Sequence, residues 1–252
     1  MARQARQQSQ SGIYHLILRG INKQVIFEDD EDRGKFLWCL RYYKEPGQYQ
    51  VYGYCLMSNH IHLLIKEGKE PIATTMKRIG VSYVSWFNRK YERCGHLFQD
   101  RFRSEPVEND AYFLTVLRYI HQNPVKSGET NKAEEYQWSS YRAYLGEGGL
   151  VDTDFALALF SSEREIAVSR LAGFMNEKAE DIDMILYRPN KMTDQEAELV
   201  IQKVAGVSSG ELQGMERRKR DEILRDIKQI DGITTRQLAR LTGITQSVIV
   251  RV

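Results

Sequence analysis

Residues 49–66, YQVYGYCLMSNHIHLLIK, consist of two strand-like runs, 49–57 and 60–66, separated by Ser58-Asn59. Both runs have the length and the apolar content of a β-strand. A two-residue connection between such runs is typical of a β-hairpin, although Ser-Asn favours the turn less than Asn-Gly does. The segment therefore predicts two adjacent antiparallel strands.

Five further segments have the residue spacing of a strand or a helix. They are the strand candidates 13–18 and 102–107 and the helix candidates 30–43, 72–91 and 110–123. Pro46-Gly47 interrupts the first helical pattern, and Pro124 is expected to end the last helix. The order strand, helix, strand, strand, helix, strand, helix predicts an α+β, ferredoxin-like fold, with helices packed on one face of an antiparallel sheet.

The sequence changes character beyond about Trp138, and residues 151–252 contain helix candidates without a convincing strand. The run Gly146-Glu147-Gly148-Gly149 is the predicted boundary. We therefore expect a first domain of residues 1–145 and a helical domain of residues 146–252.

Residues 234–248 have the apolar pattern of a helix-turn-helix, with Gly243 at the turn. A buried helical hairpin without a role in DNA binding is the alternative interpretation. If the motif is real, it binds duplex DNA through side chains near the end of the chain. These are Thr245, Gln246, Ser247 and Arg251.

The composition is typical of a globular protein, with 42% apolar and 28% charged residues in a chain of 252. The net charge of +2 is too small to indicate nucleic acid binding, but acidic and basic runs are separated, at 28–32 and 217–220. Three widely spaced cysteines indicate free thiols in a reducing compartment, and the polar N-terminus is unlike a secretory signal. Since no stretch is long and apolar enough to cross a membrane, we expect a cytoplasmic protein.

The second strand of the hairpin begins with His60-Ile61-His62. Side chains at positions i and i+2 of a strand leave the same face, with Cα atoms about 6.5 Å apart, so two imidazoles can converge on one cation. Imidazole suits Zn, Mn, Fe, Co or Ni better than Ca. Exposed or core histidines are the alternative. We interpret His15, on the first strand, as a packing residue that can neighbour the pair.

The segment 118–124, RYIHQNP, carries a tyrosine and two amides. Tyr119 and Asn123 share a helical face at i and i+4, and Gln122 lies beside them. A phenol and an amide oxygen next to two imidazoles would supply a nucleophile and a third metal ligand. Tyr112, seven residues earlier, is the rival among the 14 tyrosines, but only Tyr119 has the amide partner.

These groups fit phosphodiester chemistry. A cation held by the two histidines and the amide of Asn123, or of Gln122, would offset negative charge in the transition state. The oxygen of Tyr119 would attack the phosphorus after losing its proton, since an unperturbed phenol has a pKa of about 10. A phosphotyrosine retains the bond energy, so a second strand end can reverse the step without ATP.

The motifs resemble those of the HUH single-tyrosine transposases and, within them, of the REP-associated tyrosine transposases. The resemblance rests on 57–64, MSNHIHLL, and on 119–126, YIHQNPVK. Lesser matches are 19–22, RGIN, and 98–102, FQDRF, and together the motifs span about residues 11–145.

This resemblance implies a ferredoxin-like nuclease fold, Mg²⁺ or Mn²⁺ as cofactor, single-stranded DNA as substrate and a 5′-phosphotyrosine intermediate. It implies a metal held by His60, His62 and Asn123. It also implies recognition of hairpins formed by palindromic DNA, by a monomer or a homodimer. The candidates for phosphate contact, for which a solvated surface is the alternative, are Arg19, Arg101, Arg103 and Lys126.

Three other functions remain open at this point. A non-catalytic regulator that binds hairpin or duplex DNA has no need of the intact set of histidines, tyrosine and amide. A replication initiator or relaxase of the HUH type would use the same chemistry, but the single tyrosine and the Gln-Asn-Pro segment favour a transposase. An unrelated metal-dependent hydrolase would need acidic residues that do not accompany His60 and His62 here.

Overall fold

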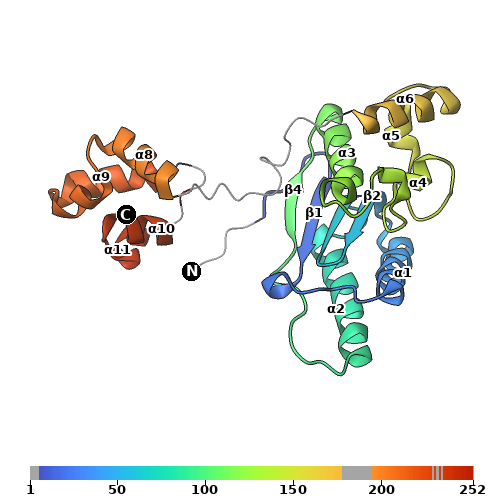
Figure 1. The fold of residues 1–252 in the computed structure, drawn as a ribbon, viewed down its shortest axis with the longest axis horizontal. Coiled ribbons are helices and arrows are strands. Elements are labelled where there is room, and N and C mark those ends of the chain that lie inside the picture. The colour runs from blue at the N-terminus through green and yellow to red at the C-terminus, as the bar shows by residue number, and fades with distance from the viewer. Residues whose placement is uncertain (1–5, 178–193, 229, 231–232, 234, 252) are drawn as a thin grey trace. The chain divides into compact units, whose positions relative to one another are not determined.

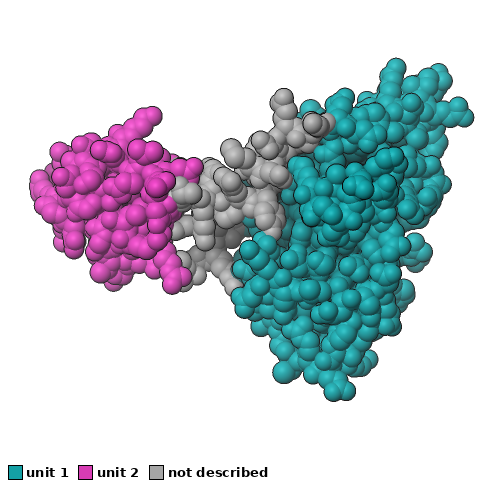
Figure 2. Space-filling model, in the orientation of Figure 1, with its two compact units in different colours: residues 1–179 teal, residues 180–252 magenta. Residues whose placement is uncertain are grey.

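The computed structural model describes residues 6–177, 194–228, 230, 233 and 235–251. The chain divides into two compact units, residues 1–179 and residues 180–252 (Figure 2). The predicted boundary after residue 145 therefore lies inside the first unit.

A four-stranded antiparallel sheet with the strand order β2-β3-β1-β4 forms the centre of the first unit (Figure 1). The strands are β1 (Ile13–Arg19), β2 (Gln50–Met57), β3 (His60–Lys66) and β4 (Arg103–Pro106). The predicted hairpin is confirmed as β2 and β3. Its neighbours β1 and β4 complete the order of a split βαβ, ferredoxin-like sheet, which the sequence also predicted.

Two helices pack on one face of this sheet, α1 (Asp30–Gly47) and α2 (Ile72–Lys90). Their side chains share one core with Leu16, Ile61 and Leu63, which alternate along β1 and β3. A third helix, α3 (Asp110–Lys126), covers the opposite face, where a side chain on Gly53 would meet Leu117.

The expectation that helices pack on one face only is therefore wrong. The sequence of β3 gives the physical reason, since all five residues between its ends are buried. His62 and Leu64 are buried on one face and Ile61, Leu63 and Ile65 on the other, so the strand is covered on both sides.

Two prolines lie inside helices instead of before their ends. Pro124 and Pro46 fall in the last turns of α3 and α1, which end two residues and one residue later. Pro124 has no N–H, so α3 lacks one backbone hydrogen bond near its C-terminal end. The helical hydrogen bonding continues after it, since Ser127 N donates to Asn123 O. The α3 helix therefore carries Tyr119 and Asn123 together in regular geometry.

The glycine-rich run 146–149 is a turn and not a linker. Gly146 and Gly149 have positive φ, and after the turn the chain returns to the edge of β2. There, Asp152 N donates to Val51 O over 2.7 Å, and Val51 N donates to the Asp152 carboxylate over 2.8 Å.

The segments that follow pack against α3. The unit includes α4 (Tyr141–Tyr144), α5 (Asp154–Ala158) and α6 (Arg164–Asn176). The guanidinium of Arg118 lies 4.1 Å from the ring centroid of Phe174, and Gln122 Nε2 donates to Met175 O over 2.6 Å. These contacts explain why the first unit continues past residue 145.

The second unit is helical. It contains α8 (Asp194–Ala205), α9 (Arg217–Lys228), α10 (Thr235–Thr242) and α11 (Gln246–Arg251) around a small apolar core. Gly243, with φ of +69°, connects α10 to α11, as the sequence predicted. Leu238, Ile244 and Ile249 are buried in this core, and Val248 is partly buried against it.

Short 3-10 helices complete the described structure: Ile21–Lys23, Ala133–Glu135 and Ser209–Gly214.

The two charged runs have local roles. In the acidic run, Asp29 caps α1 and Lys90 pairs with it and with Asp32. In the basic run, Arg217 pairs with Asp221 one turn later in α9.

The contact between β2 and α3 gives a stability prediction. A Cβ on Gly53 would lie 2.9 Å from Leu117 Cδ1, so Gly53→Val overpacks a buried contact and should lower the free energy of unfolding by about 1–3 kcal/mol. Gly80→Ala is the matched control, since Gly80 lies in α2 with open space around it. This substitution should raise the free energy of unfolding by roughly 0.5–1 kcal/mol, because glycine destabilises a helix interior relative to alanine. Urea unfolding followed by circular dichroism measures both, and equal effects would contradict the packing argument.

Candidate active site

The site lies between β3 and α3, where two histidines meet one amide. His62 is fully buried and His60 half-buried, and both point to the face of the sheet that α3 covers. Asn123 Oδ1 lies 3.4 Å from His60 Nε2, and Asn123 Nδ2 lies 3.3 Å from His62 Nε2. The three side chains that the sequence singled out as candidate metal ligands are therefore adjacent.

Hydrogen bonding fixes the proton of His60. The Asn59 amide donates its N–H to Lys23 O over 3.3 Å, which turns its oxygen towards His60 Nδ1 at 2.7 Å. His60 therefore donates from Nδ1 and keeps a lone pair on Nε2. That lone pair faces Asn123 Oδ1, which is also an acceptor, so the two electron-rich atoms suit a cation between them.

The spacing of these atoms fits a metal ion. Ligand atoms bound at about 2.1 Å to one ion are about 3.0 Å apart at right angles and about 3.4 Å apart at tetrahedral angles. The separation between the two acceptor atoms, Asn123 Oδ1 and His60 Nε2, is 3.4 Å and falls in this range. Among the residues that the structure describes, no three His, Cys, Asp or Glu side chains form a metal cluster, and here the third candidate is an amide.

Both histidines are suited to bind a cation because they are neutral. Burial, with a smaller contribution from the charge of Arg19, lowers the pKa of His60 to about 4. Burial and the neighbouring His15 and His60 hold the pKa of His62 well below its usual range. A neutral imidazole presents a lone pair, whereas a protonated one does not.

Tyr119 lies directly over this group. Its ring centroid is 5.3 Å from that of His62, in an edge-to-face arrangement, and its side chain is 3% exposed. Lys126 Nζ lies 5.3 Å from the same ring. The rival Tyr112 lies near Glu105, and burial together with that carboxylate raises its pKa to about 12.

The remaining amide of this segment is directed elsewhere. Gln122 Nε2 donates to Met175 O and to Glu177 O, over 2.6 and 3.0 Å. Since these contacts turn the side chain towards α6, Asn123 rather than Gln122 is the amide beside the histidines. His121 also points away, and its Nε2 lies 2.8 Å from Ser140 Oγ.

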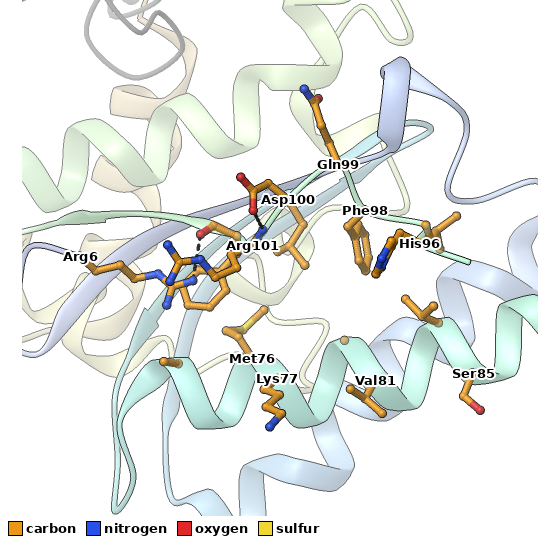
Figure 3. A pocket seen from close by; sticks show the side chains of 16 residues that line it. Arg6, Met76, Lys77, Val81, Ser85, His96, Phe98, Gln99, Asp100 and Arg101 are labelled. Carbon is orange, nitrogen blue, oxygen red and sulfur yellow. Dashed lines mark hydrogen bonds between the residues drawn. The ribbon is translucent and has the colours of Figure 1, made fainter. Parts of the chain in front are cut away.

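Three of the four predicted phosphate contacts lie on the face of the sheet that carries the histidines, or on α3. Arg19 is the register partner of His60, Arg103 that of Ile17, and Lys126 lies beside Tyr119. Arg101 is placed differently. It lines a pocket of about 840 Å³ between α2 and residues 96–102, next to Arg6 (Figure 3). Arg6 stacks on Phe102 there, 3.8 Å from its ring centroid.

The candidates in the second unit form a surface of their own. Thr245, Ser247 and Arg251 are exposed, and Gln246 Nε2 donates to Thr235 Oγ1 over 3.2 Å. They therefore belong to α11 and the turn before it, which lie in the second compact unit.

The sequence placed His15 near the histidine pair only as a packing residue, and the structure shows a direct polar contact. His15 Nε2 lies 3.0 Å from His62 Nδ1, and the two rings stack with centroids 5.2 Å apart. Its position on the first strand was a signal, but the contact depends on the register, in which Ile17 pairs with His62 and His15 with Leu64. His15 and His62 are thus diagonal neighbours on one face.

Two general observations bear on function. Cys39 and Cys55 are buried free thiols and Cys94 is an exposed one. No helix among the residues in the described ranges has the length and hydropathy needed to cross a membrane.

A comparison with a solved structure agrees with the fold. A REP-associated tyrosine transposase bound to a REP hairpin is similar over 60% of this chain and 89% of its own, with a TM-score of 0.51 and 16% identity. A bacterial tRNA(His) guanylyltransferase-like protein in complex with ATP is similar over 50% and 67%, with a TM-score of 0.32 and 12% identity. A comparison with curated protein sequences gives no match.

A family model covers the part of the chain that carries most of the motifs. The model described as an IS200-like transposase matches residues 8–123. That range includes β1, the hairpin with the histidine pair, and α3 as far as Asn123. Residues 8–123 of the first unit are therefore similar to the IS200-like transposases.

Proposed function

We propose that this chain is a transposase of the REP-associated tyrosine branch that cleaves and rejoins single-stranded DNA at hairpin sites. The observation that carries the proposal is the convergence of His60, His62 and Asn123 beneath the ring of Tyr119. The solved relative bound to a REP hairpin supports a hairpin of palindromic DNA as the substrate.

The residues present fit a divalent cation, Mg²⁺ or Mn²⁺, held by His60, His62 and Asn123. When bound, such an ion polarises a non-bridging phosphate oxygen and offsets the charge of the transition state. Asn59 and His15 would hold the two imidazoles in the required orientation through their hydrogen bonds.

Tyr119 acts as the nucleophile in this proposal. Its phenol loses its proton and its oxygen attacks the phosphorus, forming a P–O bond to tyrosine. The bond from phosphorus to the 3′ oxygen of the neighbouring nucleotide breaks, and that oxygen takes up a proton. The products are a 5′-phosphotyrosine and a free 3′ hydroxyl. Attack by the 3′ hydroxyl of another strand end reverses the step and rejoins the DNA.

Positive side chains would bind the substrate backbone around the nucleophile. Lys126 is exposed next to Tyr119, and Arg19 lies beside His60. Both can neutralise phosphates on either side of the cleaved bond. In the second unit, α10 and α11 would act as a helix-turn-helix that holds duplex DNA through α11. The active form would be a monomer or a homodimer.

A non-catalytic regulator that binds hairpin DNA is the alternative. It would need the fold and the basic residues but not the buried group of histidines, amide and tyrosine. Because an unused buried polar cluster costs stability, the intact cluster favours catalysis.

The experiment that tests the proposal is an assay for a covalent adduct. The full chain is mixed with Mn²⁺ and labelled single-stranded hairpin oligonucleotides taken from the DNA flanking its gene. We expect a protein–DNA adduct on a denaturing gel that EDTA prevents, because removal of the metal leaves the phosphate charge uncompensated. Tight hairpin binding without any adduct in Mg²⁺ or Mn²⁺ would overturn the catalytic proposal in favour of the regulator.

A further inference from the structure

A buried histidine and a carboxylate lie behind the candidate metal ligand His62. His15 is fully buried on β1, and the adjacent strand β4 places Glu105 opposite it in the sheet. His15 Nδ1 lies 3.8 Å from Glu105 Oε2, and both atoms are buried without a hydrogen-bond partner. Two buried, unsatisfied polar atoms that face each other are costly unless they serve each other or a neighbour.

The hydrogen bonds in this region fit one arrangement of protons. The Asn123 Nδ2 group can donate to His62 Nε2, which makes that nitrogen an acceptor. His62 then carries its proton on Nδ1 and donates to His15 Nε2, 3.0 Å away. His15 in turn carries its proton on Nδ1, directed towards the Glu105 carboxylate. Every donor along this row therefore faces an acceptor.

We propose that His15, supported by Glu105, is a positioning residue that holds His62 as the tautomer protonated on Nδ1. This inference rests on the proposed function, because that tautomer is the one whose Nε2 lone pair points to Asn123 and the candidate metal site. Without an acceptor behind it, His62 would populate the other tautomer, whose Nε2 proton blocks coordination.

The stacked geometry adds a second constraint. The rings of His15 and His62 are 16° from parallel, and Tyr119 contacts both rings edge-on, with centroids 6.0 and 5.3 Å away. Rotation of His62 about its side-chain bonds would therefore collide with His15 or Tyr119. His15 therefore fixes both the position of the proton on His62 and the direction of the His62 Nε2 lone pair.

Metal titration of the full chain tests this inference. We expect His15→Leu to weaken Mn²⁺ binding, measured by calorimetry, by roughly 10- to 100-fold, as is typical when a partner of a ligating histidine is removed. His15→Gln should restore most of the affinity, because a glutamine oxygen can accept a hydrogen bond near the position of Nε2. Glu105→Gln, which keeps the shape and removes the charge, should give an intermediate loss.

His121→Leu is the matched control, because His121 is also fully buried and also has a single ring nitrogen in a hydrogen bond. It should be destabilised like His15→Leu but should bind Mn²⁺ as the wild type does. Folded His15→Leu protein with wild-type affinity would overturn the inference.

A second measurement does not depend on metal or activity. Imidazole ¹⁵N chemical shifts of the metal-free chain report which ring nitrogen of His62 carries the proton. We expect Nδ1 to be protonated in the wild type and in His15→Gln, with loss of this preference in His15→Leu. An Nε2 proton on wild-type His62 would overturn the inference. A wild type that binds no Mn²⁺ and forms no adduct, yet shows the expected tautomer, would contradict the proposed function alone.

Discussion

Tyr119→Phe should abolish the covalent protein–DNA adduct while leaving the fold and hairpin binding intact. The substitution removes one oxygen atom from a ring that packs against His62 and His15, so its packing is retained. Loss of a nucleophile from a catalytic group lowers the rate by roughly three orders of magnitude or more. The measurement is the initial rate of adduct formation in Mn²⁺, together with hairpin affinity by fluorescence anisotropy.

Tyr112→Phe is the matched control on the same helix. Tyr112 lies near Glu105, and its raised pKa of about 12 makes its phenol harder to ionise than an ordinary one. We therefore expect its variant to form the adduct at a rate close to that of the wild type. Loss of the adduct in Tyr112→Phe, with retention in Tyr119→Phe, would move the nucleophile to position 112.

The sheet and the core of the candidate site could be predicted because both depend on local spacing. The hairpin follows from two apolar runs around Ser58-Asn59, and β3 carries His60 and His62 on one face because strands alternate. Tyr119 and Asn123 meet through the spacing of a helical turn. None of these relations requires knowledge of distant parts of the chain.

Other features depend on contacts between distant segments, and sequence spacing does not contain them. The histidine face of β3 is covered by α3, and nothing in the apolar run of β3 says which helix covers which face. The position of His15 depends on the register between β1 and β3. Arg101 and Arg103 are two residues apart, yet only Arg103 lies in β4, while Arg101 lines the pocket beside Arg6.

The misplaced domain boundary has a similar cause. A glycine-rich run is compatible with a linker and with a turn, and only the hydrogen bonds of Asp152 to Val51 distinguish them. The packing of α6 on Arg118 and Gln122 then extends the first unit. Deletion of residues after 145 would therefore expose one side of the helix that carries the candidate nucleophile.

The second large effect is expected at the amide. Asn123→Leu removes the oxygen that lies 3.4 Å from His60 Nε2 and should lower the rate of adduct formation by roughly 10²- to 10³-fold, the usual effect of losing one group that stabilises developing charge. Asn123→Asp keeps an oxygen at the same position and should retain most of the rate in Mn²⁺. Aspartate has nearly the volume of asparagine, whereas leucine shares its branching at Cγ but is larger, so circular dichroism of Asn123→Leu is the control for its fold.

The metal dependence of these variants separates two explanations of a lost rate. If Asn123 helps to hold a cation, excess Mn²⁺ should partly rescue Asn123→Leu, because a weakened site is filled at higher concentration by mass action. If Asn123 only orients His62 through its amide N–H, Mn²⁺ affinity falls in Asn123→Asp as well, since that N–H is lost in both variants. The adduct rate is therefore titrated against Mn²⁺ for both variants. If Asn123 is a metal ligand, the aspartate oxygen replaces its oxygen and only Asn123→Leu needs more Mn²⁺. If Asn123 only orients His62, both variants need more Mn²⁺.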